Sequence, residues 1–333
     1  MNQTCPDRPF SPAKWMSALI AIAGSVLLPG LAVSEEGGSG HYLPGSMASF
    51  IDAVPPAETF ILRANVIYYD GSIGATKPLP IGGRTALGVD ATSWGYGLTV
   101  LWRPPLELGK GWSYAMSTTI PYLMVDVSAD VTPTLPGGAS GSVSRSSSTN
   151  GLGDIVLMPL MLNYNVHPDF NVNFRVGVYA PTGRYEVGRL ANTGKNFWTI
   201  EPVLGLMYFG QKNGLEASAF FGADFNTENE DTDYQSGTQV HLDGTLAQHF
   251  PLLGGLAGGG VSAYYYKQVT ADSGSGATLG DFEGKTVGFG PVVSYVSKVW
   301  GYDAILELKW LHEVETENRL EGEIVWFKGV CKF

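Results

Sequence analysis

Hydrophobic and polar residues alternate with a period of two along much of the chain, the pattern of a β-strand with two unlike faces. Residues 170–180, FNVNFRVGVYA, place phenylalanines and valines on one face and Asn171, Asn173 and Arg175 on the other. Helical periodicity fits such stretches poorly. Twelve stretches of this kind are predicted as strands, at 58–69, 92–103, 112–127, 151–165, 170–180, 197–209, 214–226, 238–250, 254–268, 285–297, 302–314 and 322–333.

The length of these strands and of their connections indicates a membrane barrel. Most of the stretches run for ten residues or more, whereas strands of soluble proteins average about five or six residues and a strand that crosses a bilayer needs about 9–11. Short connections alternate with long polar ones, as in outer-membrane barrels. We therefore predict an all-β fold, a transmembrane antiparallel β-barrel of about 12 strands with short periplasmic turns and long extracellular loops.

Aromatic residues fall near the ends of the predicted strands. In residues 93–103, SWGYGLTVLWR, Trp94 and Tyr96 lie at one end of an apolar face and Trp102 lies at the other. Amphipathic rings favour the two interfaces of a bilayer. The alternative is that these are ordinary core aromatics of a soluble β protein.

The first 34 residues have the features of a secretory signal peptide. Basic residues (Arg8 and Lys14) precede an apolar run, 16–33, and small residues end it at Ala32 and Ser34. We predict a signal peptide at 1–34, an N-terminal periplasmic segment at 35–57 and a barrel at 58–333. An uncleaved anchor helix is the alternative for the first segment.

Composition and charge agree with export to a bacterial envelope. Charged residues make up only 15% of the chain, glycine is abundant with 44 residues, and the formal net charge is −11. An acidic exported chain is unsuited to bind nucleic acid, so no nucleic-acid partner is expected. After signal cleavage only Cys331 remains, so no internal disulfide can form.

A series of loop motifs resembles a known envelope family. It includes GLGD (151–154), APTGRYEVGRLANTGKNFWTIEP (180–202), NTENEDTDYQSG (226–237) and GFGPVVSY (288–295). Together these motifs resemble the outer-membrane family associated with the meta-cleavage pathway of phenol degradation. The resemblance implies an outer-membrane transporter of a Gram-negative bacterium.

The residues themselves favour no enzyme. His241 and His249 share a predicted strand but lie about 27 Å apart at the rise of a strand, so the two cannot chelate one ion. No serine and histidine are placed together by any motif, and GLGD lacks the third glycine of a phosphate loop. We expect no catalytic residues, no metal and no cofactor.

Function is expected on the inward faces of the strands. Strand parity predicts lumen or ligand positions at Arg63, Asn65, Arg175, Glu201, His241, Asp243, Tyr264, Tyr266, Glu307 and Lys309. Mixed charges inside a barrel form either a route for a ligand or a network that merely solvates the wall. Tyr264 and Tyr266 are the more suggestive pair, because two rings on one face could hold an aromatic solute.

Two further features bear on a transport route. The N-terminal segment could plug the lumen through His41, Tyr42, Leu43, Ile51 and Val54, or it could be a mobile leader. Pro121 and Pro159 lie on neighbouring strands, where proline cannot complete the hydrogen-bond ladder. They form either a lateral seam through which an apolar solute could leave or a pair of tolerated kinks.

The expected function is that of an outer-membrane channel for passive uptake of small hydrophobic compounds, with aromatic compounds among the candidates. The alternative is a structural or ligand-binding envelope barrel with a filled lumen and no transport. Expected partners are outer-membrane lipid, lipopolysaccharide, the solute, and the barrel assembly machinery through the terminal Phe333. An acidic loop with Glu228, Glu230, Asp231 and Asp233 could bind calcium, although a solvated loop is favoured.

Overall fold

The computed structural model describes residues 40–81, 84–131, 143–277 and 283–333. The predicted signal peptide at 1–34 and the first residues of the N-terminal segment, 35–39, lie outside the described residues. Among the described residues, no helix is long and apolar enough to cross a membrane.

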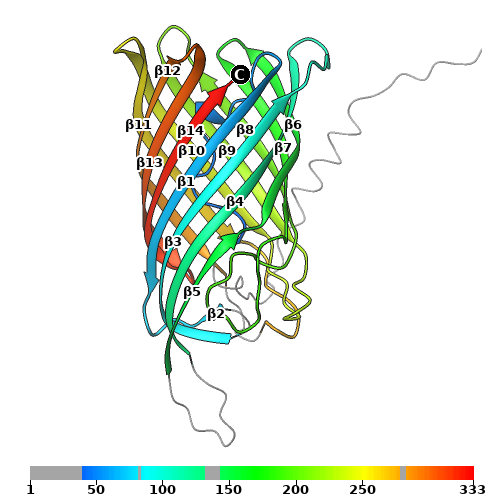
Figure 1. Ribbon diagram of the computed structural model, residues 1–333, viewed down its shortest axis with the longest axis vertical. Helices are drawn as coiled ribbons and strands as arrows, with labels where there is room; N and C mark the ends of the chain where they lie inside the picture. Colours follow the sequence, from blue (N-terminus) through cyan, green and yellow to red (C-terminus); the bar gives the residue numbers. More distant parts are fainter. Residues whose placement is uncertain (1–39, 82–83, 132–142, 278–282) are drawn as a thin grey trace, which may run out of the picture. The chain divides into compact units, whose positions relative to one another are not determined.

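Twelve antiparallel strands of the described chain close into a barrel (Figure 1). Each strand pairs with its neighbours, and β1 pairs with β14 from Ile61–Lys332 to Ser72–Glu321, so the barrel has no open edge there. The predicted fold class is confirmed. The barrel strands are β1 (Thr59–Ile73), β3 (Arg84–Arg103), β4 (Trp112–Val131), β6 (Ile155–His167), β7 (Phe170–Ala180), β8 (Thr199–Phe209), β9 (Leu215–Asn226), β10 (Gln239–Leu252), β11 (Gly255–Gln268), β12 (Lys285–Val299), β13 (Tyr302–Glu317) and β14 (Glu321–Lys332).

Two additional strands extend the sheet at the end of the barrel that carries the long loops. β2 (Leu79–Ile81) pairs with the start of β3, and β5 (Val143–Leu152) pairs with the second half of β4. Parts of 70–91 and 128–150, which lie between the predicted strands, are therefore strand as well. β4 is long enough to change partners, since it pairs with β6 as far as Thr119 and with β5 from Tyr122 onward.

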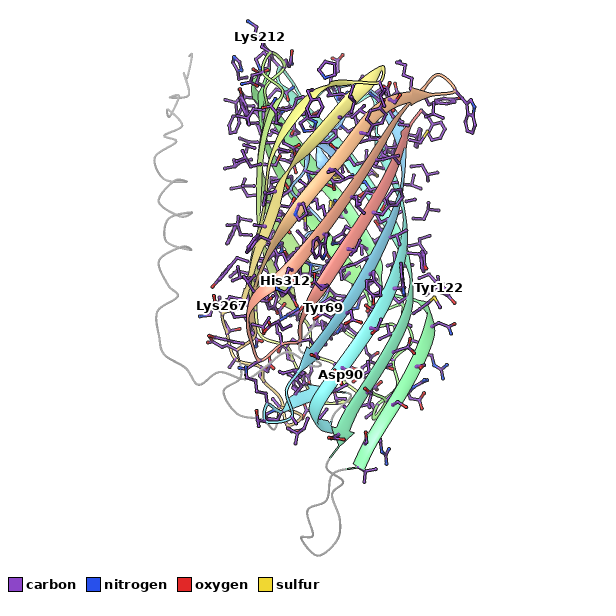
Figure 2. All side chains as sticks on the ribbon, turned by 90° about the vertical axis from the view of Figure 1, so that its left-hand side faces the viewer. Tyr69, Asp90, Tyr122, Lys212, Lys267 and His312 are labelled. Atoms are coloured by element: carbon purple, nitrogen blue, oxygen red, sulfur yellow. The ribbon has the colours of Figure 1, made fainter. Side chains whose placement is uncertain are left out.

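The two faces of the barrel differ as the period of two requires. In β8, Leu204 and Leu206 are 45% and 42% exposed on the outer face, whereas Val203 is buried on the inner face. Figure 2 shows side chains projecting from the outer face along the height of the barrel. Lys212 lies at the end with short turns, which we call the turn end, and Lys267 lies toward the opposite loop end.

Residues 40–57, named the lumenal segment here, run inside the barrel (Figure 1). Their only regular element among the described residues is a single 3-10 turn, η2 (Phe50–Asp52). Tyr42, Met47, Ala48, Ile51 and Val54 of this segment are buried.

The last residue of the chain ties the two ends of the barrel wall together. The Phe333 N–H donates to Phe60 O at 3.0 Å, and the Thr59 hydroxyl donates to Phe333 O at 2.6 Å. The chain thus ends on the hydrogen bonds that join the first and last strands at the turn end.

Candidate functional site

Lysines of the barrel wall satisfy carbonyl groups of the lumenal segment. Lys309 Nζ lies 3.2 Å from Gly45 O and 3.0 Å from Met47 O, and Lys328 Nζ lies 2.8 Å from Ser46 O. Buried backbone without a helix or ladder must find its partners elsewhere. Here the partners are cations on β13 and β14.

Asp52 is the acid that the lumenal segment contributes in return. Arg63 Nη1 donates to its carboxylate at 2.8 Å, and Lys328 Nζ lies 3.8 Å away. Arg63 also donates to Ile51 O at 2.9 Å, and Arg175 donates to Asp52 O at 3.0 Å. We call Arg63, Lys328 and Lys309, on the adjacent strands β1, β14 and β13, the cationic side of the lumen.

Carboxylates on other strands hold the donors of the segment. Asp243 accepts from the Tyr42 hydroxyl at 2.8 Å and from Gly45 N–H at 2.9 Å. Glu216 accepts from Phe50 N–H at 2.7 Å. Together with Glu201 and Asp224, these residues form what we call the acidic side of the lumen, on β8, β9 and β10.

The GLGD motif anchors the start of the segment near the loop end. His41 Nε2 lies 3.0 Å from Asp154 Oδ2, and His41 Nδ1 lies 2.6 Å from the Thr199 hydroxyl. Asp154 also accepts from the backbone N–H groups of Gly183 and Lys195, both in the long loop after β7. Sequence reasoning did not select Asp154 as a site residue, although the motif that contains it was a visible signal.

The five predicted plug residues do not share one environment. His41, Tyr42, Ile51 and Val54 are buried, but Leu43 is 45% exposed. Val54 packs in an apolar cluster with Leu101, Ala115 and Met161. Hydrogen bonds to charged wall residues hold much of the rest of the segment, so its surroundings are polar as well as apolar.

All ten predicted lumen residues face inward, but the structure divides them into groups. One group bonds to the lumenal segment or to a residue that does, and consists of Arg63, Arg175, Glu307 and Lys309. A second group lies together on the acidic side and consists of Glu201, His241 and Asp243. Asn65 lies apart and donates to the Thr99 hydroxyl at 3.1 Å.

The predicted tyrosine pair is already engaged by the protein. The Tyr264 hydroxyl donates to Glu313 at 2.7 Å. The ring of Tyr266 lies parallel to that of Tyr42, with 5.9 Å between centroids, and the Arg319 guanidinium lies over the Tyr266 ring, 4.1 Å from its centroid. An aromatic solute would have to displace one of these groups to use either ring.

The two seam prolines mark irregular pairing on both sides of β6. The β4–β6 register shifts between Ala115 and Ser117, and the β6–β7 register shifts between Leu157 and Leu160, around Pro159. Pro121 lies where β4 leaves β6 for β5, and its carbonyl accepts from Gly153 N–H at 2.9 Å. Between the two prolines three residue pairs of the β4–β6 ladder are intact.

The acidic loop brings two of its four carboxyl groups together, since a side-chain hydrogen bond with Asp233 raises the pKa of Glu228. Hydrogen bonds from Ser275 lower the pKa of the Asp233 carboxyl, while Asp231 accepts from Asn196 at 3.0 Å. Among the described residues, the one set of three or more acids and histidines that could hold a metal ion is Glu201, Asp224 and His241, which does not include this loop.

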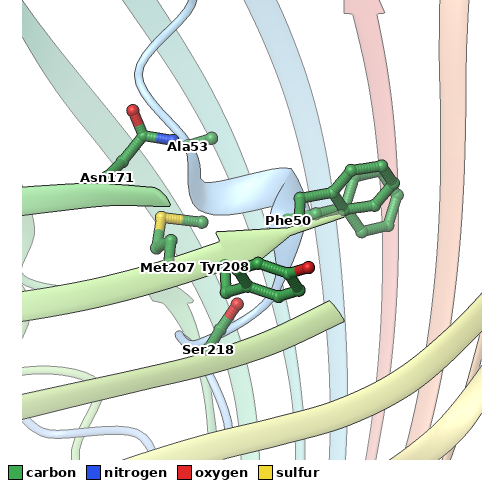
Figure 3. Close-up of a pocket in the computed structure, with 7 residues that line it drawn as sticks. Phe50, Ala53, Asn171, Met207, Tyr208 and Ser218 are labelled. Carbon is green, nitrogen blue, oxygen red and sulfur yellow. The ribbon is translucent and has the colours of Figure 1, made fainter. Parts of the chain in front are cut away.

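A cavity of about 170 Å³ opens beside the lumenal segment at the turn end (Figure 3). Phe50 and Ala53 of the segment border it, and Asn171, Met207 and Ser218 belong to the barrel wall. Its lining is mostly apolar.

Comparison with known proteins fits this architecture. Residues 77–329 match the family described as "Putative MetA-pathway of phenol degradation". The chain belongs to this family. The COG4313 outer membrane channel from Pseudomonas putida F1 has a similar fold, with a TM-score of 0.65 and 15% identity over 88% of this chain and 100% of that one.

More distant barrels add nothing about function. The β domain of the Bordetella autotransporter BrkA has a TM-score of 0.45 and 10% identity, covering 83% of this chain and 99% of that one. A FadL homologue of Pseudomonas aeruginosa has a TM-score of 0.40 and 8% identity, covering 82% and 89%. No curated protein sequence matches the chain.

Family membership and the closed barrel together give the location. This member of the phenol-degradation family is a bacterial outer-membrane protein with the architecture of an outer-membrane channel. Its outer face meets lipid, and its distinctive feature is the segment bound across the lumen between the cationic and acidic sides.

Proposed function

We propose that the protein is a channel for passive uptake of small apolar solutes, including aromatic ones, and that the lumenal segment is its plug. The observation that carries this proposal is the bonding of the segment across the lumen, from Lys309 and Lys328 on one side to Asp243 and Glu216 on the other. A barrel whose interior is so occupied passes solute only when the segment shifts.

The bonds that hold the segment suit a plug that can move. They are mostly polar, and water entering the lumen can replace a hydrogen bond at modest net cost. Apolar packing is confined to small clusters such as that of Met47, Ala48 and Phe220. A shift of the segment would therefore mainly replace its hydrogen bonds to the wall by hydrogen bonds to water. It would expose little apolar surface.

The turn-end cavity supports the choice of a small apolar solute. Phe50, Met207 and Phe209 give it apolar walls, and its volume is about 170 Å³. An engineered apolar cavity of about 150 Å³ binds benzene. A single aromatic ring is thus the size of solute that this space accepts.

We propose Pro121 and Pro159 as a weak point of the wall, through which an apolar solute leaves toward the bilayer. The register shifts around Pro159 and the change of partner at Pro121 support it. Replacing both prolines with valine should slow uptake of an aromatic solute. Unchanged uptake would reject the seam.

A second candidate function rests on the same filled lumen. If the segment never moves, the protein is a structural or ligand-binding barrel that transports nothing. The paired charges around Asp52 favour this alternative, because buried ion pairs hold the segment in the absence of a solute.

Uptake measurements separate the two candidates. Cells that lack the protein and cells complemented with it would be compared for uptake of labelled phenol, an alkane and a sugar. We expect complementation to restore uptake of phenol but not of the sugar. Equal phenol uptake with and without the protein would favour the structural barrel.

A further inference from the structure

His241 is a buried imidazole that lies among three carboxylates. Its Nε2 lies 2.9 Å from Glu201 Oε1 and 3.9 Å from Asp224 Oδ1, and its Nδ1 lies 3.4 Å from Asp243 Oδ2. All four residues are at most 1% exposed. Neither ring nitrogen makes a hydrogen bond of normal geometry.

The group places three carboxylates around a single imidazole. Bringing several buried carboxylates together is unfavourable unless cations or hydrogen-bond donors hold them. The hydroxyls of Tyr42 and Tyr179 donate to Asp243 and Glu201 but carry no charge. Arg175, on the neighbouring strand β7, donates instead to Asn173 and Asp52.

The donor atoms are spaced for a metal ion. One atom each from Glu201, Asp224 and His241 lie within 4.8 Å of one another. An ion bound at about 2.0–2.2 Å to nitrogen and oxygen ligands separates neighbouring ligands by about 3.4 Å in a tetrahedral site. A histidine that binds a metal commonly directs its other ring nitrogen to a carboxylate, and Asp243 occupies that place.

The fold makes room for this arrangement. Gly222 is the cross-strand neighbour of His241, and a Cβ on Gly222 would lie 2.2 Å from His241 Nε2. The missing side chain lets the imidazole lean over β9 toward Glu201 and Asp224. The Tyr42 ring stacks on the imidazole at 3.9 Å between centroids and covers it from the lumen.

The geometry points to a divalent metal site formed by His241, Glu201 and Asp224, with Asp243 orienting the histidine. A ligand set of one imidazole and two carboxylates suits a transition metal such as Zn²⁺ better than Mg²⁺ or Ca²⁺. The sequence argument against a metal compared two histidines along one strand, whereas this site draws one ligand from each of three adjacent strands. The site does not depend on whether the barrel transports a solute.

Zinc binding by the purified full-length barrel tests the site. The protein in detergent would be treated with EDTA, titrated with Zn²⁺ by calorimetry, and assayed for retained metal after dialysis. We expect about one Zn²⁺ per chain that an excess of Mg²⁺ does not displace, and a rise in thermal stability on binding. No retained zinc in the folded wild-type barrel would overturn the proposal.

Matched variants locate the ion. Glu201→Gln and Asp224→Asn keep the side-chain shapes and should each weaken zinc binding by more than about tenfold, and Asp243→Asn by about tenfold. Glu216→Gln is the control, because Glu216 and His249 form a similar buried pair, at 2.7 Å, without a third ligand. Gly222→Ala, which changes no ligand residue but crowds the His241 imidazole, should also weaken binding. Equal losses in Glu216→Gln and Glu201→Gln would contradict the site.

Discussion

On the cationic side of the lumen, Lys309 and Lys328 donate to carbonyl oxygens of the lumenal segment, whereas on the acidic side Asp243 and Glu216 accept from its donors. The cationic side also receives a counter-charge from the segment, Asp52. From the segment, the acidic side receives neutral donors on Tyr42, Gly45 and Phe50. The segment thus brings a charged partner to the first side and uncharged donors to the second.

The segment should therefore depend more on the cationic side than on the acidic side. Losing Asp52 should disturb the segment most, because Arg63 then lacks its ion-pair partner. Losing Asp243 should disturb it less, because this removes hydrogen bonds to the segment and no ion pair with it. Variants on the two sides test this order.

The largest effect is expected for Asp52→Asn. Breaking a buried ion pair by neutralising one partner costs about 3–5 kcal/mol, since the other charge stays buried. We expect the local opening free energy of residues 44–53, measured by amide hydrogen exchange, to fall by about 3 kcal/mol. Asp70→Asn is the control: Asp70 accepts from Thr92 on the exposed face. Equal exchange in the two variants would refute the role of Asp52.

A smaller effect is expected for Asp243→Asn. The change weakens two hydrogen bonds to a charged acceptor, from the Tyr42 hydroxyl and Gly45 N–H, for a loss of about 2 kcal/mol. Exchange at Gly45 should speed up more than exchange at Ala53, which bonds within the 3-10 turn. An equal increase in exchange at Gly45 and Ala53 would show that Asp243 does not hold Gly45 specifically.

Trp326→Phe should have a smaller effect still. The Trp326 indole donates to Pro44 O at 2.8 Å, and a neutral hydrogen bond contributes about 1 kcal/mol. Protease cleavage within residues 40–57 should become modestly faster. Trp94→Phe, on the outer face, provides the comparison and should leave cleavage unchanged. A faster rate in both variants would indicate a general loosening of the barrel.

Much of the barrel could be predicted from the sequence, because the period of two and the spacing of the turns are local properties. The start of β3 was missed because no clean alternation marks it. The register between β3 and β4 shifts there, between Leu87 and Asp90. β5 was missed because VSRSSSTNGL is polar on both faces. Its pairing depends on the excess length of β4, which alternation alone does not reveal.

The inward direction of the site residues could also be predicted from the local alternation, but the partners of these residues could not. Lys309 meets Gly45 across 264 positions of sequence, and Glu201, Asp224 and His241 meet only because their strands are adjacent at one register. Parity places a side chain on a face without giving its height or its neighbour. The sequence therefore showed how many charged residues face the lumen. It did not show that they divide into a cationic side and an acidic side.

The smallest effect is expected outside the lumen, at Asp233. Hydrogen bonds from Ser275 lower the pKa of this exposed carboxyl, so they stabilise the loop at neutral pH. The ordinary pKa of an aspartate is about 4. The stabilisation is therefore complete above that pH and is lost as the pH falls through the lowered pKa of Asp233. Ser275→Ala should raise the Asp233 pKa toward its ordinary value in an NMR titration, with no change in zinc binding or in exchange of the lumenal segment. An unchanged pKa would show that Ser275 does not hold the carboxylate.

The claim that the lumenal segment closes the lumen is tested most directly by single-channel conductance in planar bilayers. The intact barrel would be compared with a variant that lacks residues 40–54, after both are shown to fold. Our account predicts a several-fold larger conductance in the shortened protein. Equal conductance in the two proteins would contradict it.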